Sequence, residues 1–566
     1  MANHKKTEHR QKKYIFVVGG VMSGVGKGIA ASSVALLLKA RGLTVTALKI
    51  DPYINVDAGT MNPTEHGEVF VLKDGRETDQ DMGNYERFLE VELTGENYMT
   101  TGSIYLDVIR KERNLEYKGK NVEVVPHIPL EVIGRITKAA ELAKADVTII
   151  EIGGTVGEYQ NILFLEAVRM MKTELGGNVA VILVSYLPVP GSIGEMKTKP
   201  TQYAARTLNS AGVFADIIIA RSPVGVDEKR KEKIAQFCNV KKENVISAPD
   251  VKSVYDVPIN FEKDGISAKL CDMLELNCKS PAQLDTWKKF VAKTKNAKKE
   301  VKIAVVGKYF SSGDFILSDV YISVLEAIKY SAYAHGAKPI ITYLSSVEFE
   351  KGSRKLSELK KYDGVLIPGG FGATGVEGKI KVIEYVRKNN IPFFGICYGM
   401  QLAVIEYARH VLGLSGAHTA EVDPKSAHLV INVMPDQKEK IAKNDMGGTM
   451  RLGEYLADIA KGTHAERAYK ARHSTERHRH RYEVSPAYID QLEKGGIVFS
   501  GKSPDKTLME IMELPSKVHP FFVGVQFHPE FHARPLSPHP IFSAFIKASL
   551  NTSKKPLEKA NVVRPN

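Results

Sequence analysis

The segment that most constrains how this chain can fold is Tyr14–Ala40, where an apolar run, a glycine-rich loop and a helical pattern follow one another. Tyr14–Val18 has the length and the β-branched composition of a buried strand. From Ile29 onwards, Ala and Leu recur at helical spacing. Between them, glycines let backbone N–H groups approach phosphate oxygens, while Lys27 and the helix N-terminus add positive charge. This pattern favours a phosphate-binding loop over an ordinary tight turn.

The loop differs from the standard phosphate-binding motif at two points. Five residues, rather than four, separate Gly20 from Gly26, and Gly28 stands where a Ser or Thr hydroxyl would bind Mg²⁺. If ATP binds here, the metal needs ligands from elsewhere. Glu151 is the preferred candidate, because the end of a buried apolar strand does not carry an unpaired carboxylate without a large cost. Asp81 is the second candidate.

Further apolar runs in the first half predict a parallel sheet, because strands alternate with helical segments. Lys49, near the end of the second predicted strand, should lie close to the phosphates. The polar stretch Gly59–Tyr85 is expected to be irregular. Lys197–Gln202 holds two lysines beside a proline-fixed turn, and it could bind phosphate and a base edge or form a surface loop. The predicted elements are strands at Leu43–Ile50, Ala145–Ile152, Val179–Ser185 and Asp216–Ala220 and a helix at Val132–Ala145.

The second half reads as a separate α/β unit that begins at Val301. The lysine-rich stretch Ser280–Glu300 before it predicts a linker. This stretch holds the only tryptophan, Trp287, which could dock on one of the domains. The predicted elements of the second unit are strands that begin at Val301, Tyr362 and Ile391 and helices at Ser318–His335 and Tyr398–His410.

A nucleophile elbow is predicted at Gly395–Gly399, where a strand meets a helix around Cys397. The helix N-terminus favours thiolate over thiol, so catalysis is preferred to a buried structural cysteine. His528 and Glu530 lie two residues apart, so in an extended segment they point to one side and could complete a Cys–His–Glu triad. Backbone N–H groups at Gly370 and after the cysteine could hold the oxyanion.

The basic cluster Arg477–Tyr482 is by default a solvated face, with binding of a substrate carboxylate as the alternative.

Length and composition indicate a globular chain of two to four domains, with 566 residues and a net charge of +13. Part of that charge sits in residues 4–13 and 554–566, which are expected to be disordered. No nucleic-acid module, spanning apolar stretch or signal peptide is recognisable, so we expect neither nucleic acid nor membrane as partner. The four cysteines show neither CxxC spacing nor a disulfide-rich pattern, which fits a reducing cytoplasm.

Motifs along almost the whole chain carry a family resemblance. They include GGVMSGVGKGI, KIDPYINVDAGTMNP, EIGGTVGE, KTKPTQ, PGGFG, GICYGMQ, ERHRHRYEV and QFHPEF. The second half resembles a class I glutamine amidotransferase domain, and the whole chain resembles the CTP synthase family. The implied α/β fold has two domains: a P-loop-like parallel-sheet amidoligase domain over residues 14–279, a linker over 280–300 and an amidotransferase domain over 301–549. Residues 1–13 and 550–566 are tails.

The resemblance implies amination of UTP to CTP, with ATP and Mg²⁺, and with ammonia passed internally from glutamine. It also implies activation by GTP, inhibition by CTP and a homotetramer in the cytoplasm. The implied ATP site comprises Gly24, Val25, Gly26, Lys27, Gly28, Ile29, Asp81, Pro249, Asp250 and Val251, with Asp81 and Glu151 on Mg²⁺. The implied pyrimidine site comprises Ser23, Glu158, Tyr159, Gln160, Lys197, Thr198, Lys199, Pro200, Thr201, Gln202 and Lys233. The implied glutamine site comprises Gly370, Tyr398, Gly399, Met400, Gln401, Glu421 and Arg481 around Cys397, His528 and Glu530.

Two other functions stay open from the sequence. One is a different glutamine-dependent amidoligase, of the cobyrinate or dethiobiotin-like branch, against which KTKPTQ and the length of the match argue. The other is a non-enzymatic P-loop regulator or filament-forming scaffold, against which the complete triad argues.

Overall fold

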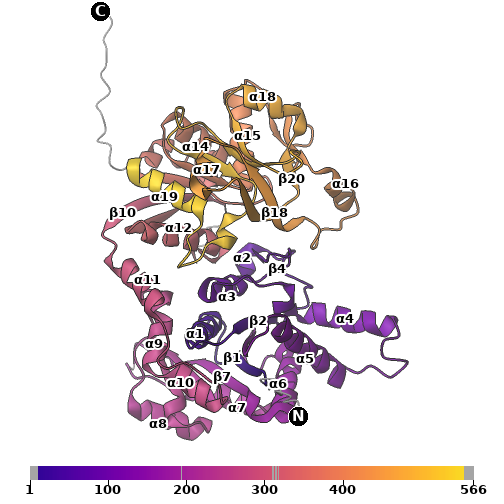
Figure 1. The fold of residues 1–566 in the computed structure, drawn as a ribbon, viewed down its shortest axis with the longest axis vertical. Helices are drawn as coiled ribbons and strands as arrows, with labels where there is room; N and C mark the ends of the chain where they lie inside the picture. The colour runs from indigo at the N-terminus through magenta and orange to yellow at the C-terminus, as the bar shows by residue number, and fades with distance from the viewer. Residues whose placement is uncertain (1–10, 193, 309–310, 313–314, 317, 553–566) are drawn as a thin grey trace, which may run out of the picture. The chain divides into compact units, whose positions relative to one another are not determined.

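The computed structural model describes residues 11–192, 194–308, 311–312, 315–316 and 318–552. The expectation of disordered tails therefore falls largely outside the described residues. The chain forms two compact units, and Figure 1 colours them by residue number from the N-terminus to the C-terminus. The first comprises residues 1–58 and 81–291, and the second comprises residues 59–80 and 292–566. Within the described residues, no helix is long and apolar enough to cross a membrane.

The first unit is built on a seven-stranded sheet in which every strand pair is parallel. Alternate residues of the first strand face a core shared with α5, α6 and α7, while α1 packs with α3 and α9. The strands, in sheet order, are β5 (Tyr98–Thr100), β2 (Val45–Asp51), β6 (Val147–Ile152), β1 (Lys13–Gly19), β7 (Val179–Tyr186), β8 (Ile217–Ser222) and β9 (Val245–Pro249). The helices are α1 (Lys27–Ala40), α3 (Asp81–Leu89), α4 (Thr101–Arg113), α5 (Val124–Leu142), α6 (Ile162–Leu175), α7 (Lys199–Ser210), α8 (Glu228–Cys238), α9 (Val257–Lys263) and α10 (Ile266–Met273).

The second unit holds a nine-stranded sheet that is parallel from β13 to β23 and antiparallel from β23 to β19. Its order is β13 (Ala337–Ser345), β10 (Lys299–Gly307), β14 (Gly364–Ile367), β15 (Phe393–Ile396), β23 (Phe522–Val525), β22 (Met509–Glu513), β21 (Val498–Lys502), β18 (Arg451–Ile459) and β19 (His473–His480). A three-stranded sheet contains β16 (His418–Thr419), β17 (Leu429–Val433) and β20 (Tyr482–Val484), and β11 (Ser311–Ser312) pairs with β12 (Phe315–Ile316). The helices are α12 (Ile322–Ala334), α13 (Ser346–Glu350), α14 (Val376–Lys388), α15 (Tyr398–His410), α16 (Pro435–Ala442), α17 (His464–Tyr469), α18 (Ile489–Lys494) and α19 (Pro540–Thr552). The expected two-part α/β fold is confirmed.

The stretch Gly59–Gln80 differs from expectation in structure and in the unit to which it belongs. It is not irregular throughout, since it holds α2 (Pro63–His66) and a small hairpin of β3 (Phe70–Val71) and β4 (Glu77–Thr78). The expected boundaries place it in the first domain, yet it is part of the second unit. Its polar side chains find buried partners there, which local composition does not reveal.

The expected linker contains a helix, α11 (Asp285–Asn296). Trp287 is buried in the first unit, where its ring lies 5.1 Å from that of Phe88 and its Nε1–H donates to the Tyr255 carbonyl at 2.9 Å. Apolar residues at Trp287, Phe290 and Val291 give the lysine-rich segment one buried face, so it docks rather than hanging free.

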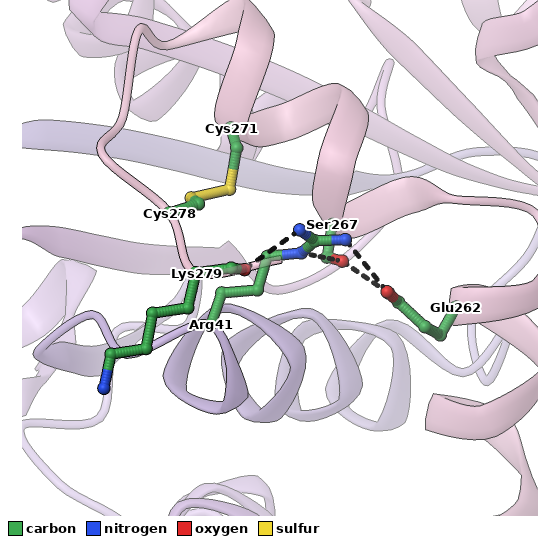
Figure 2. Close-up of a disulfide and its surroundings, with 6 residues drawn as sticks. All are labelled: Arg41, Glu262, Ser267, Cys271, Cys278 and Lys279. Carbon is green, nitrogen blue, oxygen red and sulfur yellow. Dashed lines mark hydrogen bonds and ion pairs between the residues drawn. A yellow bond between two sulfur atoms is a disulfide. The ribbon is translucent and has the colours of Figure 1, made fainter. Parts of the chain in front are cut away.

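Cys271 and Cys278 form a disulfide, which the cysteine spacing did not predict. α10 ends before the chain turns back, and this brings the two Cα atoms to 6.2 Å, within bonding range. Figure 2 shows that Lys279, the residue after Cys278, lies beside Arg41, which follows the last residue of α1. Arg41 donates to the Lys279 carbonyl at 3.2 Å and to Glu262 at 3.0 Å, and the Lys279 N–H donates back to the Arg41 carbonyl.

Candidate functional site

The glycine-rich loop joins β1 to α1, and the helix begins at Lys27, two residues earlier than expected. Gly24 and Gly26 have φ of +70° and +87°, a left-handed conformation that glycine adopts without penalty. Lys27 is 8% exposed, and its Nζ donates to the Gly154 carbonyl at 2.7 Å. Burial lowers the pKa of Lys27. The loop and the start of α1 therefore offer backbone N–H groups and a positive charge at one corner of the sheet.

The two predicted metal ligands meet at Lys49. Its Nζ lies 2.5 Å from Asp81 Oδ2 and 2.9 Å from Glu151 Oε1. The register of the parallel strands places Lys49 directly beside Glu151, and α3 brings Asp81 in from above the strand ends. Asp51 Oδ1 is 3.7 Å from the same Nζ. Three carboxylates thus surround one ammonium group.

Burial raises the pKa of Glu151, and the Lys49 charge offsets only part of that shift. For Asp81, burial is outweighed by the charge and hydrogen bond of Lys49, so the pKa of Asp81 falls. The Tyr85 hydroxyl donates to Glu151 Oε2. Carboxylate oxygens are the ligands that Mg²⁺ prefers, so this donor set fits the ion.

Arg221 lies beside the phosphate loop, and the sequence analysis did not predict it. Its Nη2 donates to Asp250 Oδ1 at 2.6 Å. A small cavity beside α1 is lined by Arg221 together with Pro249 and Val251, two of the expected adenine contacts. The place of Arg221 at the carboxyl end of β8, the edge where parallel sheets bind ligands, was the available signal.

The expected pyrimidine residues fall into separate groups, each bonded within itself. Glu158 accepts hydrogen bonds from the Thr155 N–H at 3.1 Å and from the Gln160 amide at 2.8 Å, while Tyr159 is 90% exposed. Thr201 is buried in the first turn of α7, where its hydroxyl lies 2.8 Å from that of Ser185.

The remaining members of the pyrimidine set are distributed over other elements. Ser23 is exposed on the phosphate loop, Lys233 is exposed on α8, and Lys197 pairs with Glu195 at 2.6 Å. Thr198 accepts a hydrogen bond from the Gln202 amide at 3.1 Å, and Lys199 and Pro200 open α7.

Cys397 has the backbone of an elbow. It lies between β15 and α15 with φ +50° and ψ −101°, a strained conformation for a residue with a side chain. A Cβ on Gly399 would lie 2.2 Å from the Ile367 carbonyl oxygen, and one on Gly395 would lie 2.8 Å from the Gly399 backbone. Only glycines permit this turn, which presents the thiol at the end of the sheet.

His528 and Glu530 stand next to the thiol. His528 Nδ1 lies 2.8 Å from Glu530 Oε1, and both residues are buried. The segment is not extended as expected, because Pro529–His532 forms a short 3₁₀ turn, η9; the contact forms all the same. Burial lowers the pKa of His528, but the charges of Glu530 and Cys397 outweigh this and raise it to about 10.

The expected glutamine residues are divided between the pocket and its support. Gly370 lines a cavity of about 70 Å³ with His528 and Glu530. Glu421 accepts a hydrogen bond from the Gly372 N–H at 2.6 Å, and Tyr398 donates to the Gly372 carbonyl at 3.1 Å.

The other expected glutamine residues support the site from behind. Gly399 and Met400 are buried in the core. Gln401 donates to Gln526 at 3.2 Å, and Gln526, which the sequence analysis missed, donates to the Cys397 sulfur at 3.6 Å. Arg481 donates to Gln437, Met446 and Thr449.

Arg479 ties the Gly59–Gln80 segment to this pocket. Its Nε donates to Glu77 at 2.8 Å, its Nη2 donates to the Gly59 carbonyl at 3.2 Å, and its own carbonyl lies 3.9 Å from Cys397 Sγ. Glu68 and Val69 line the same cavity as His528. The sequence analysis did not assign Glu68 or Glu77 to this site, because their partners Ser323 and Arg479 lie 255 and 402 positions away along the chain.

The basic cluster Arg477–Tyr482 is not a solvated face. Arg477, His478 and His480 are 0%, 1% and 4% exposed. His478 and His480 lie 3.0 Å apart, and burial lowers the pKa of both well below the ordinary value. These side chains form the inner layer beneath the pocket.

A second histidine–carboxylate cluster lies behind the triad. Glu476 Oε1 lies 3.0 Å from His539 Nε2, and Glu476 Oε2 lies 3.4 Å from His532 Nδ1. His539 Nδ1 accepts a hydrogen bond from the Ile541 N–H, so Nε2 carries the proton that is shared with Glu476. The cluster is a hydrogen-bonded network that joins β19 to η9 and α19, rather than a set of free lone pairs for a metal.

Comparisons with known proteins match the two halves of the chain to two different families. A family described as the CTP synthase N-terminus matches residues 13–276, and class-I glutamine amidotransferase matches residues 316–548. A CTP synthase of Halalkalibacterium halodurans is 48% identical over 95% of this chain and 99% of its own length. A CTP synthase of Pyrococcus furiosus is 49% identical over 95% and 98%. The solved glutaminase domain of Trypanosoma brucei CTPS with bound acivicin is 37% identical and covers 44% of this chain and 94% of that one, with a TM-score of 0.40.

Proposed function

Because the chain belongs to the CTP synthase family, we propose that it converts UTP to CTP, with ATP as the activating nucleotide and glutamine as the source of nitrogen. The observation that carries the proposal is the presence, in one chain, of two sites with complementary chemistry. The first unit has a phosphate loop beside a carboxylate cluster, and the second has a cysteine elbow beside a histidine–carboxylate pair. The two reactions are connected if the ammonia released at the cysteine site is consumed at the nucleotide site.

In the first unit, the N–H groups at the start of α1 and the Lys27 ammonium bind nucleotide phosphates. Asp81 and Glu151 would hold Mg²⁺, which neutralises phosphate charge during phosphoryl transfer. Lys49 keeps the two carboxylates together before the nucleotide arrives. Arg221, Pro249 and Val251, which line the small cavity beside α1, would contact the adenine ring.

In the second unit, the Cys397 thiolate attacks the side-chain amide carbon of glutamine. A C–S bond forms, and the amide electrons pass to the carbonyl oxygen, which faces the N–H groups of Gly370 and Tyr398. His528 gives its proton to the nitrogen, and the C–N bond breaks. Ammonia departs, and a γ-glutamyl thioester remains on Cys397. Water, deprotonated by His528, then releases glutamate and restores the thiolate. Glu530 holds the imidazole ring throughout.

The finer assignments belong to the same proposal. Glu158–Gln160, Lys197–Gln202 and Lys233 contribute to the UTP and CTP site, and their separation into groups fits a site completed by another subunit of a homotetramer. GTP activates and CTP inhibits. Apart from Gly59–Gln80, the domains divide near residues 280–300, and the enzyme works in the cytoplasm.

The decisive assay is CTP formation from UTP with ATP and either glutamine or ammonium. Wild type should use both nitrogen sources. Cys397→Ala should lose glutamine hydrolysis and glutamine-dependent CTP formation by several orders of magnitude and keep synthesis from ammonium.

Cys238→Ala is the matched control, since Cys238 is also buried and free, lies on α8, and burial raises its pKa to about 11. It should keep both activities. Product formation from another acid substrate but not from UTP would favour a different amidoligase. Loss of both activities in folded Cys397→Ala would contradict the division of labour.

A further inference from the structure

The Lys379 ammonium is buried without a hydrogen-bond acceptor among the described residues. The residue lies on α14 with 0% exposure. An ammonium group removed from water and left unpaired is costly, so such groups are rare unless another interaction uses them. Neutral side chains of similar length would fill the same space at no such cost.

The ammonium lies against two residues that carry the proposed oxyanion donors: Gly370, in the loop after β14, and Tyr398, at the start of α15. Its Nζ is 5.3 Å from the centre of the Tyr398 ring, and a Cβ built on Gly370 would lie 3.8 Å from it. Gly370 and Tyr398 are the two residues whose N–H groups face the oxyanion in the proposed reaction. Lys379 therefore contacts both residues that carry these donors, through the backbone of Gly370 and the ring of Tyr398.

Two other charged side chains hold the same loop, and each has a partner in it. Lys308, which follows β10, donates to the Phe371 carbonyl, and Glu421, which follows β16, accepts from the Gly372 N–H at 2.6 Å. Lys308 and Glu421 neutralise one another in sum, which leaves the charge of Lys379 uncompensated. Burial and the nearby Lys308 lower the pKa of Lys379 to about 7, against the raising effect of Glu421.

We propose that Lys379 is a positioning residue of the glutaminase reaction, whose ammonium acts through the Gly369–Gly370 backbone to stabilise the oxyanion formed when Cys397 attacks glutamine. The inference rests on the proposed glutaminase function. In the ground state the charge of the nearby Glu421 carboxylate is offset by Lys308, whereas in the tetrahedral intermediate a full negative charge develops on the far side of the loop. An interaction absent from the ground state and present in the transition state raises kcat rather than lowering KM.

The test is Lys379→Met, which keeps the length of the side chain and removes its charge. We expect kcat for glutamine hydrolysis to fall at least tenfold while KM changes less than threefold. Inhibition by glutamate γ-semialdehyde, which forms a tetrahedral adduct with a thiol, should weaken about as much as kcat falls. Ammonium-dependent CTP formation should be unchanged, because that reaction needs no oxyanion at Cys397.

Lys381→Met is the matched control, since Lys381 is exposed on the same helix and donates to the Glu350 carbonyl. It should behave as wild type. Wild-type kcat/KM should lose the Lys379 contribution as the pH rises through about 7, and this inflection should be missing in Lys379→Met. The groups that face Lys379 are Lys308, Glu421 and Tyr398. Lys308→Met should keep the inflection but move it to higher pH, because Lys308 lowers the pKa of Lys379.

An unchanged kcat in Lys379→Met, or a loss of ammonium-dependent synthesis equal to that of glutaminase, would overturn the proposal. If the Met variant does not fold, Lys379→Gln gives the same comparison. Absence of glutaminase activity in wild type would instead refute the proposed function itself.

Discussion

Gly28 and Asp81 fill one corner of the nucleotide loop together: a Cβ on residue 28 would lie 2.1 Å from Asp81 Oδ1. The standard motif places a metal-binding hydroxyl at this point of the helix. Here α3 supplies a carboxylate in that space, so a side chain on α1 has no room. Glycine in place of Ser or Thr at position 28 and an acidic residue at position 81 therefore depend on each other.

Gly28→Ser should lower CTP formation at least a hundredfold with either glutamine or ammonium, because the added atoms displace Asp81. Asp81→Asn and Glu151→Gln should do the same by removing metal ligands. Glutamine hydrolysis measured alone should persist in all three variants. Near-normal ammonium-dependent synthesis in Asp81→Asn and Glu151→Gln would rule out the metal assignment.

The pH range of glutamine hydrolysis should depend on Glu530. His528 has a pKa raised to about 10, so its imidazolium and the pairing with Glu530 are fully present below the unfolded-state value and are lost as the pH rises through about 10. Glu530→Gln removes the neighbouring charge and should move the alkaline limb of kcat/KM to lower pH. The pH profile of ammonium-dependent synthesis serves as the control. Coincident alkaline limbs in wild type and variant would show that the pair does not set the profile.

The disulfide predicts a thiol count. Cys238 and Cys397 are free, so two of the four cysteines should react under denaturing, non-reducing conditions, and all four should react after reduction. Cys278→Ser should lower stability by about 2 kcal/mol without reductant, as expected from closing a loop of this size. The same variant should match wild type in reductant. Four reactive thiols in the unreduced protein would contradict the bond.

Assembly is predicted to respond to nucleotides. Tyr159 is 90% exposed, and Ile162, Phe214 and Phe237 expose more than half of their surface on the same unit. Apolar surface of this kind is typical of association. If subunits complete the pyrimidine site, ATP with UTP should shift the sedimentation coefficient towards a tetramer. A monomer at every protein and ligand concentration would refute this.

Sequence reasoning was most successful where burial alone decides structure. The strands around Phe16, Ile149 and Val181 were predicted within one to two residues, because continuous apolar runs flanked by turns have few other folds. The short strands β5 and β9 were missed, since three to five residues give too little periodicity. Cys397 and its elbow were predicted because the glycine spacing is itself a steric requirement.

The remaining parts of the site depend on partners that are distant along the chain. The pairing of His528 with Glu530 was expected from extended geometry and arises instead from a 3₁₀ turn. Arg479 is part of the site because it binds Glu77, and Lys379 because it lies beside Gly370. No local sequence pattern predicts either contact. Composition suggested a solvated cluster at Arg477, whereas tertiary burial determined the outcome.

The membership of Gly59–Gln80 in the second unit sets an order of events during synthesis. These residues leave the ribosome early, and the strand that carries Arg479 follows almost 400 residues later. At about 5–20 residues per second, the interval is about 20–80 s. During that time Glu77 lacks its partner Arg479, and Glu68 lacks Ser323 for the first part of it. The first unit must therefore form its sheet while a segment between its strands waits for the second unit. A nascent chain halted before residue 473 would therefore expose this hairpin to proteases, and the finished chain would protect it.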